Sequence, residues 1–139
     1  MKKALFATMA LGAAVVFAGS ASAEKLKATL DGKSEVPATT SSGTGMADLD
    51  YDAATKKLSW KVSYSGLSGP ATAAHFHGPA ETGKNAGVAV PIAGIANSPA
   101  EGSATLTDAQ ASDLLAGKLY VNIHTAANPG GEIRGQVTK

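Results

Sequence analysis

Large apolar side chains recur at every second position along several short stretches of this chain. The clearest case is LSWKVSY, residues 58–64, in which Leu58, Trp60 and Val62 alternate with polar residues. Because successive side chains of a β-strand point to opposite faces, this pattern predicts a half-buried strand. Trp60 is the one tryptophan of the chain, and we expect it to anchor the core rather than to bind a ligand.

The same alternation, in weaker form, predicts seven further strands. Their ranges are 26–30, 46–51, 72–77, 88–92, 102–106, 119–125 and 132–137. Residues 52–57 and residues 126–131 are rich in turn formers, so they predict two hairpins. Pro91 cannot donate a hydrogen bond to a neighbouring strand, which places its strand at a sheet edge or makes it irregular.

One short helix is predicted after the strand 102–106. Thr107 and Gln110 have the spacing of a capping box, Leu114 lies near an apolar end, and Gly117 can end the helix. The expected fold class is therefore all-β. The pattern indicates an antiparallel β-sandwich or partly closed barrel of seven or eight strands, immunoglobulin-like or superoxide-dismutase-like, with one short helix.

Residues 1–23 have the pattern of a signal peptide and are not expected to belong to the fold. A positive start, MKK, precedes an apolar run of small residues, and the run ends in ASA, which fits a signal peptidase site. The alternative, an uncleaved anchor, is disfavoured because the apolar run is short and rich in alanine. We expect an exported protein, periplasmic or secreted, with one domain over residues 24–139 and no stable membrane span after cleavage.

The expected mature domain carries little net charge and no cysteine. Cleavage removes two of the 12 basic residues and none of the 11 acidic residues, which leaves a net charge of −1 with neutral histidines. The domain has no basic patch with interleaved aromatic residues, so nucleic acid is not an expected partner. The lack of cysteine excludes disulfides, thiolate metal sites and cysteine nucleophiles.

The three histidines of the chain fall in two of the predicted strands. His75 and His77 lie in AHFHGPA, two residues apart and therefore on one face of their strand, and His124 lies in VNIHT. The hairpin of the last two strands is expected to give His124 a polar face shared with Tyr120, Asn122, Glu132, Arg134 and Gln136. If the strand of His75 lies beside this hairpin, the three imidazoles converge.

Two hypotheses explain such a cluster. In the first, His75, His77 and His124 bind a metal ion, for which copper or zinc is expected because imidazole suits these ions. Glu132 is then a fourth ligand or a carboxylate that orients a histidine. In the second, the histidines belong to a structural polar network, and Glu132 and Arg134 form a surface pair or join that network. The polar surroundings expected under either hypothesis are Tyr120, Asn122 and Arg134.

Other chemistry finds less support in the sequence. The serines lack a nucleophile turn such as G-x-S-x-G. Asp48, Asp50 and Asp52 alternate with apolar residues, so we interpret them as a solvated strand face rather than as a calcium site. A His–Glu pair or an open metal position could support catalysis, but no feature specifies a substrate. An enzyme is therefore the least favoured class, and no cofactor other than copper or zinc is expected.

Three stretches carry a resemblance to a known family. They are LDGKSEVPATTSSGTGMADLD, LSWKVSYSGLSGPATAAHFHGPA and LAGKLYVNIHTAANPGGEIRGQV. Through them the chain resembles the CHRD domain, a module named from chordin and found alone in exported bacterial proteins, from about Leu26 to Val137. The resemblance implies an all-β extracytoplasmic module without an established reaction. The family pattern, carried over to this chain, includes Glu35, His75, His77, Tyr120, Asn122, His124, Gly131, Glu132 and Arg134.

The resemblance also suggests a different class of function. A non-enzymatic recognition module would bind a protein or an envelope component, and the loops 39–45 and 78–85 are its candidate contact regions. A looser similarity to copper–zinc superoxide dismutase rests on the H-x-H pattern in a β-sandwich. Because the chain lacks the full histidine set and the cysteine pair of that enzyme, dismutase activity is not expected.

Overall fold

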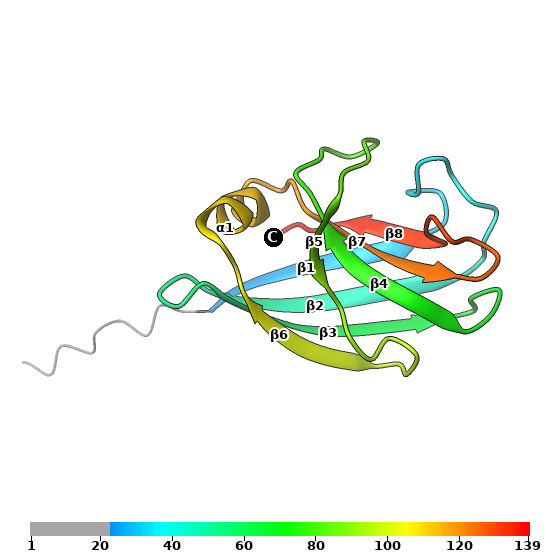
Figure 1. The fold of residues 1–139 in the computed structure, drawn as a ribbon, viewed down its shortest axis with the longest axis horizontal. Helices are drawn as coiled ribbons and strands as arrows, with labels where there is room; N and C mark the ends of the chain where they lie inside the picture. Colours follow the sequence, from blue (N-terminus) through cyan, green and yellow to red (C-terminus); the bar gives the residue numbers. More distant parts are fainter. Residues whose placement is uncertain (1–22) are drawn as a thin grey trace, which may run out of the picture.

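The computed structural model describes residues 23–139, which form eight antiparallel strands and one helix (Figure 1). The elements are β1 (Glu24–Asp31), β2 (Thr44–Asp52), β3 (Lys57–Ser65), β4 (Ala71–His77), β5 (Val88–Pro91), β6 (Ala100–Thr105), α1 (Asp108–Leu115), β7 (Tyr120–Thr125) and β8 (Ile133–Gln136). The predicted all-β class with eight strands and one short helix is confirmed. The predicted signal peptide, apart from its last residue, lies outside the described residues.

All eight strands belong to one sheet, which curls into a nearly closed barrel in the order β5-β4-β7-β8-β1-β2-β3-β6. The sheet has two halves, which we call the β1–β2 half (β1, β2, β3 and β6) and the β4–β7 half (β4, β5, β7 and β8). In the β1–β2 half the pairing of β1 with β2 is unbroken over eight residues. The halves meet where β8 pairs with β1 through Asp31 and Arg134.

The inner faces of the strands form one apolar core. Trp60 on β3 lies in this core, as its alternation predicts, and its ring packs against Phe76 on β4 with centroids 5.2 Å apart. Gly102 on β6 makes room for the indole, because a Cβ at this position would lie 2.9 Å from three of its ring atoms. The contact between Trp60 and Phe76 therefore links the two halves of the sheet through the core.

Helix α1 begins and ends as its sequence predicts. The Thr107 hydroxyl accepts a hydrogen bond from the Gln110 backbone N–H, and the Gln110 side chain accepts one from the Thr107 N–H, which is a complete capping box. Gly117 ends the helix with a φ of +74°, a conformation that glycine adopts without strain. The side-chain amide of Gln110 also donates to the Ala89 carbonyl in β5 at 2.9 Å, so the cap anchors the helix to the barrel.

The short strand β5 is an edge of the sheet and pairs with β4. Pro91 is its last residue and is exposed, as expected for a proline at an edge. Residues 78–87 connect β4 to β5, and residues 32–43 connect β1 to β2. Figure 1 shows both connections rising on the same side of the barrel as β7 and β8. On the outer face of the β4–β7 half, His77, Tyr120 and Asn122 are buried, whereas His75 and His124 are half-buried.

Candidate metal site

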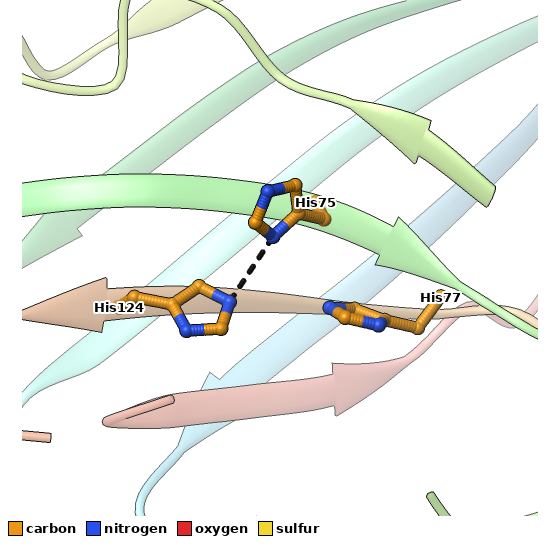
Figure 2. A group of neighbouring side chains, drawn as sticks. All are labelled: His75, His77 and His124. Carbon is orange, nitrogen blue, oxygen red and sulfur yellow. Dashed lines mark hydrogen bonds between the residues drawn. The ribbon is translucent and has the colours of Figure 1, made fainter. Parts of the chain in front are cut away.

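Strand pairing brings the three histidines together on the outer face of the β4–β7 half. Strand β4 lies beside β7, with Ala73 opposite His124 and His75 opposite Asn122. His75, His77 and His124 each offer one ring nitrogen, and these three nitrogens lie within 4.8 Å of one another. Figure 2 shows the rings facing a common space, with His75 and His77 from one strand and His124 from the next.

A backbone carbonyl fixes the ring of His124. Its Nδ1 lies 2.8 Å from the Pro129 carbonyl oxygen, which can only accept, so Nδ1 carries the proton. The lone pair of His124 is therefore on Nε2, and Nδ1 of His75 lies 3.1 Å from it (Figure 2). In the protein without metal, His75 Nδ1–H donates to His124 Nε2.

His77 is the most buried histidine, and other residues contact both of its ring nitrogens and one face of its ring. Its Nδ1 lies 3.0 Å from the Ala86 carbonyl oxygen, and its Nε2 lies 2.9 Å from Oδ1 of Asn122. The ring stacks on that of Tyr120, with centroids 4.9 Å apart and planes nearly parallel. The His77 imidazole thus has one defined position, with Nε2 on the side of the other two histidines.

The surroundings favour neutral imidazoles. Burial lowers the pKa of His75, and the neighbouring His124 and His77 lower it further. Burial also lowers the pKa of His77, more than the hydrogen bonds to Ala86 and Asn122 raise it. Both rings are therefore neutral near pH 7 and keep a lone pair for a ligand bond.

Arg134 fixes the connection 78–87 against the outer face of the β4–β7 half. Its guanidinium lies 3.5 Å above the Tyr120 ring and donates to Asn85 Oδ1 at 2.9 Å and to the Lys84 carbonyl. The side-chain amide of Asn85 then donates to the Val36 carbonyl at 2.9 Å, which links the two covering connections. Tyr120, Asn122 and Arg134, named from the sequence as polar surroundings of the histidines, all lie in this layer.

Glu35 is a functional candidate that sequence reasoning gave no role. It lies in the connection 32–43 and is only 6 % exposed, and burial raises the pKa of its carboxyl to about 7, although Asn122 and Arg134 act in the opposite direction. Its Oε2 accepts no hydrogen bond from the described residues. A residue in a loop has no periodic pattern to reveal where it points, so the family pattern was the only signal for Glu35.

The structure does not bring Glu132 to the histidines. The carboxylate of Glu132 accepts a hydrogen bond from Thr125, whose side chain points to the opposite face of β7 from that of His124. The other hydrogen-bond donors around this carboxylate come from three connections between strands. These donors are the Ser68 N–H, the Ser68 hydroxyl and the Ser41 and Asn128 side chains. Burial raises the pKa of Glu132, but the hydrogen bonds from Ser68, Thr125 and Ser41 outweigh it and lower the pKa to about 2.

Two details of the predicted polar face are therefore corrected. Strand β8 begins at Ile133, so the alternation that placed Glu132 beside Arg134 does not extend to Glu132. Arg134 and Glu132 are both buried, and they form neither a surface pair nor a mutual hydrogen bond among the described residues. Gln136 lies opposite Tyr120 in the pairing of β7 with β8, as its place in the strand predicts, and donates to the Ala80 and Gly117 carbonyls.

The geometry of the three histidines suits a transition metal. Metal–nitrogen bonds of about 2.0–2.1 Å put the nitrogens of a shared ion roughly 3–4 Å apart. The His75–His124 separation of 3.1 Å falls in this range, and the widest separation in the group, at most 4.8 Å, requires a small inward turn of a ring. Three imidazoles without a thiolate or carboxylate favour copper, zinc or nickel over calcium or magnesium.

Comparison with known proteins gives one finding. The family model described as CHRD domain matches residues 26–137, nearly the whole described part of the chain. No curated protein and no solved structure matches the chain. Within residues 23–139, no helix has the length and apolar character needed to cross a membrane.

Proposed function

The chain belongs to the CHRD domain family, and from this premise we propose that it is an exported module that binds copper or zinc. His75, His77 and His124 are the proposed ligands. The proposed location, periplasmic or secreted, follows from the signal-peptide pattern of residues 1–23. In such a location a cysteine-free site of imidazoles can hold a metal without competing disulfide chemistry.

The observation that supports this proposal most is the way two of the rings are held. The Nδ1 atoms of His77 and His124 both lie against backbone carbonyls, Ala86 and Pro129, at 3.0 and 2.8 Å. This is the outer contact that metal-binding histidines usually make, because it fixes the tautomer and directs the other nitrogen at the ion. In His124 this contact leaves the Nε2 lone pair directed at His75, inside the histidine cluster.

The proposed ligand atoms follow from these contacts. His77 and His124 would bind through Nε2, and His75 through Nδ1, the atom that donates to His124 when no metal is bound. The ion would take the place of the proton between His75 and His124, and the neutral His75 ring would then carry its proton on Nε2. A bound copper ion supplies redox chemistry and a bound zinc ion supplies a Lewis acid, but no reaction is assigned to the site.

The direct test is metal uptake by the purified protein. Equilibrium dialysis against Zn²⁺ or Cu²⁺ should show one tightly bound ion per chain in the wild type and none in the variant H75A/H77A/H124A. The matched control is D48A/D50A, which removes two acidic residues from the solvated face of β2 and should bind metal like the wild type. Equal uptake by the wild type and the triple histidine variant would reject the proposal and favour the alternative, a recognition module in which the histidines are structural.

A further inference from the structure

His77 lies between two hydrogen-bond acceptors. Its Nδ1 faces the Ala86 carbonyl and its Nε2 faces the amide oxygen of Asn122, at 3.0 and 2.9 Å. A neutral imidazole has a single N–H, so it can satisfy one of these oxygens and not both. With the proton on Nδ1, two lone pairs oppose each other between Nε2 and Asn122 Oδ1. A positive ion at this place would relieve that opposition.

The orientation of the Asn122 amide is set from its other end. Its Nδ2 lies 3.5 Å from the Gly130 carbonyl oxygen and beside the carboxyl group of Glu35. Both of these neighbours are acceptors when Glu35 is ionised, so a flipped amide would bring its oxygen against theirs. Gly130, together with Glu35 when it is ionised, therefore holds Nδ2 on this side and Oδ1 on the side of His77.

Gly131 makes this arrangement sterically possible. Its φ is +122°, and a Cβ at this position would overlap Oε2 of Glu35 and lie 2.6 Å from Nδ2 of Asn122. The space above the glycine is therefore filled by the carboxyl group and the amide, side by side. The carboxyl is buried, and its Oε2, although beside this Nδ2, accepts no hydrogen bond among the described residues, which costs free energy and calls for an explanation other than stability.

We infer, on the basis of the proposed metal function, that Asn122 Oδ1 is a fourth ligand to the ion and that Glu35 is the positioning residue that keeps this oxygen directed at it. Ligand bonds of about 2.0–2.2 Å place neighbouring ligand atoms of one ion roughly 3 Å apart. The separation of 2.9 Å between His77 Nε2 and Asn122 Oδ1 fits two such neighbours. Four ligands from three histidines and one amide are neutral, and the carboxyl group of Glu35 lies behind the amide, where its ionised form would offset the charge of the ion.

The test uses Co²⁺ as a spectroscopic probe on the purified protein and on four variants. N122A should bind Co²⁺ at least about 100-fold more weakly and change its ligand-field absorption, because a ligand is lost. E35Q should weaken binding by about tenfold, within the range expected when the partner of a ligand is removed. The double variant E35Q/N122D exchanges the two groups, so that the amide introduced at position 35 can donate to one oxygen of the carboxylate introduced at position 122. The other carboxylate oxygen then binds the ion, and affinity should return to within a few-fold of the wild type or exceed it.

The fourth variant, Q136A, separates ligation from general damage to the polar layer. Gln136 is half-buried in β8 and bonds two carbonyls without touching a histidine, so Q136A should keep the wild-type affinity and spectrum. An N122A protein with wild-type affinity and spectrum would overturn the inference, as would failure of E35Q/N122D to bind better than N122A. If the wild type itself takes up no more Co²⁺ than H75A/H77A/H124A, the metal function fails instead, which is a distinct result.

Discussion

The two halves of the barrel differ in how far the outward face of their strands is exposed to solvent. In the β1–β2 half this face is solvated: along β2 exposed and buried residues alternate strictly from Met46 to Tyr51, and Lys25 pairs with Asp50 in the solvent. In the β4–β7 half the same face is partly covered: of the outward-facing residues of β7, Tyr120 and Asn122 are buried and His124 is half-buried. A solvated polar face needs no further explanation, whereas a covered one costs free energy unless its polar groups are paired.

The outer face of the β4–β7 half is therefore the part of the barrel whose polar groups need a structural or functional explanation. This face holds three histidines, Asn122 and Arg134, and the buried Glu35 lies beside Asn122. In the β1–β2 half the outward-facing side chains of β2 are exposed to solvent instead. Four predictions compare the two halves, in order of decreasing expected effect.

The largest effect is expected from Glu132→Ala. Its carboxylate accepts hydrogen bonds from donors of three connections around the end of the β4–β7 half, so the substitution leaves those buried donors unsatisfied. We expect a loss of about 3–5 kcal/mol in the free energy of unfolding, measured by urea denaturation. Asp50→Ala, its counterpart on the solvated half, should change this free energy by less than about 1 kcal/mol. Similar losses for the two variants would refute the distinction between the halves.

Low pH should reduce the free energy of unfolding through protonation of Glu132. The pKa of Glu132 is about 2 in the folded protein, below its ordinary value of 4.5, so its contribution is complete above pH 4.5 and is lost as the pH falls toward 2. A pKa difference of this size corresponds to roughly 3 kcal/mol. The difference in stability between the wild type and E132Q, measured by denaturation at several pH values, should shrink over this range. A difference that does not change with pH would contradict the assigned charge state.

The ionisation of Glu35 should give the free energy of unfolding the opposite dependence on pH. Burial raises the pKa of its carboxyl to about 7 in the folded protein, so the carboxyl favours folding as the neutral acid and this contribution is lost as the pH rises from about 4.5 through 7. The E35Q variant does not ionise at this position. Its stability relative to the wild type should therefore rise by up to about 3 kcal/mol across this interval in metal-free buffer. A relative stability that falls with pH would show that Glu35 is ionised in the folded state and paired.

The smallest effect is expected for the ion pair of the solvated face. Lys25 and Asp50 lie 2.9 Å apart, but their side chains are 84 % and 50 % exposed. Water and salt screen such a pair, so a double-mutant cycle of K25A and D50A should give a coupling energy below about 0.5 kcal/mol. A coupling above about 1 kcal/mol would mean that the β1–β2 half also depends on its polar face.

Local patterns in the sequence were enough to predict most of the fold. A two-residue period depends only on which face of a strand is buried, and it located all eight strands to within one or two residues. It also placed Trp60 in the core, and it placed His75 and His77 on the face of their strand that Phe76 does not share. The capping box at Thr107 and Gln110 is equally local, and helix α1 begins there.

The site was predictable only in part, because it depends on contacts between distant segments. Strand parity indicated that the histidines could converge, but the pairing of β4 with β7, separated by a helix and two strands, could not be read from either strand. The prediction that Glu132 shares a strand face with Arg134 was wrong, because β8 begins at Ile133 and Glu132 still belongs to the turn. Glu35 lies in a connection without any period, and its place beside Asn122 is set by the glycine at 131.

The measurement that bears most directly on this account is the zinc-edge X-ray absorption spectrum of the protein loaded with one equivalent of Zn²⁺. The account predicts the scattering pattern of three imidazole rings around the ion, with nitrogen and oxygen neighbours at about 2.0–2.2 Å. A spectrum of hydrated or carboxylate-bound zinc, without imidazole scattering, would contradict it.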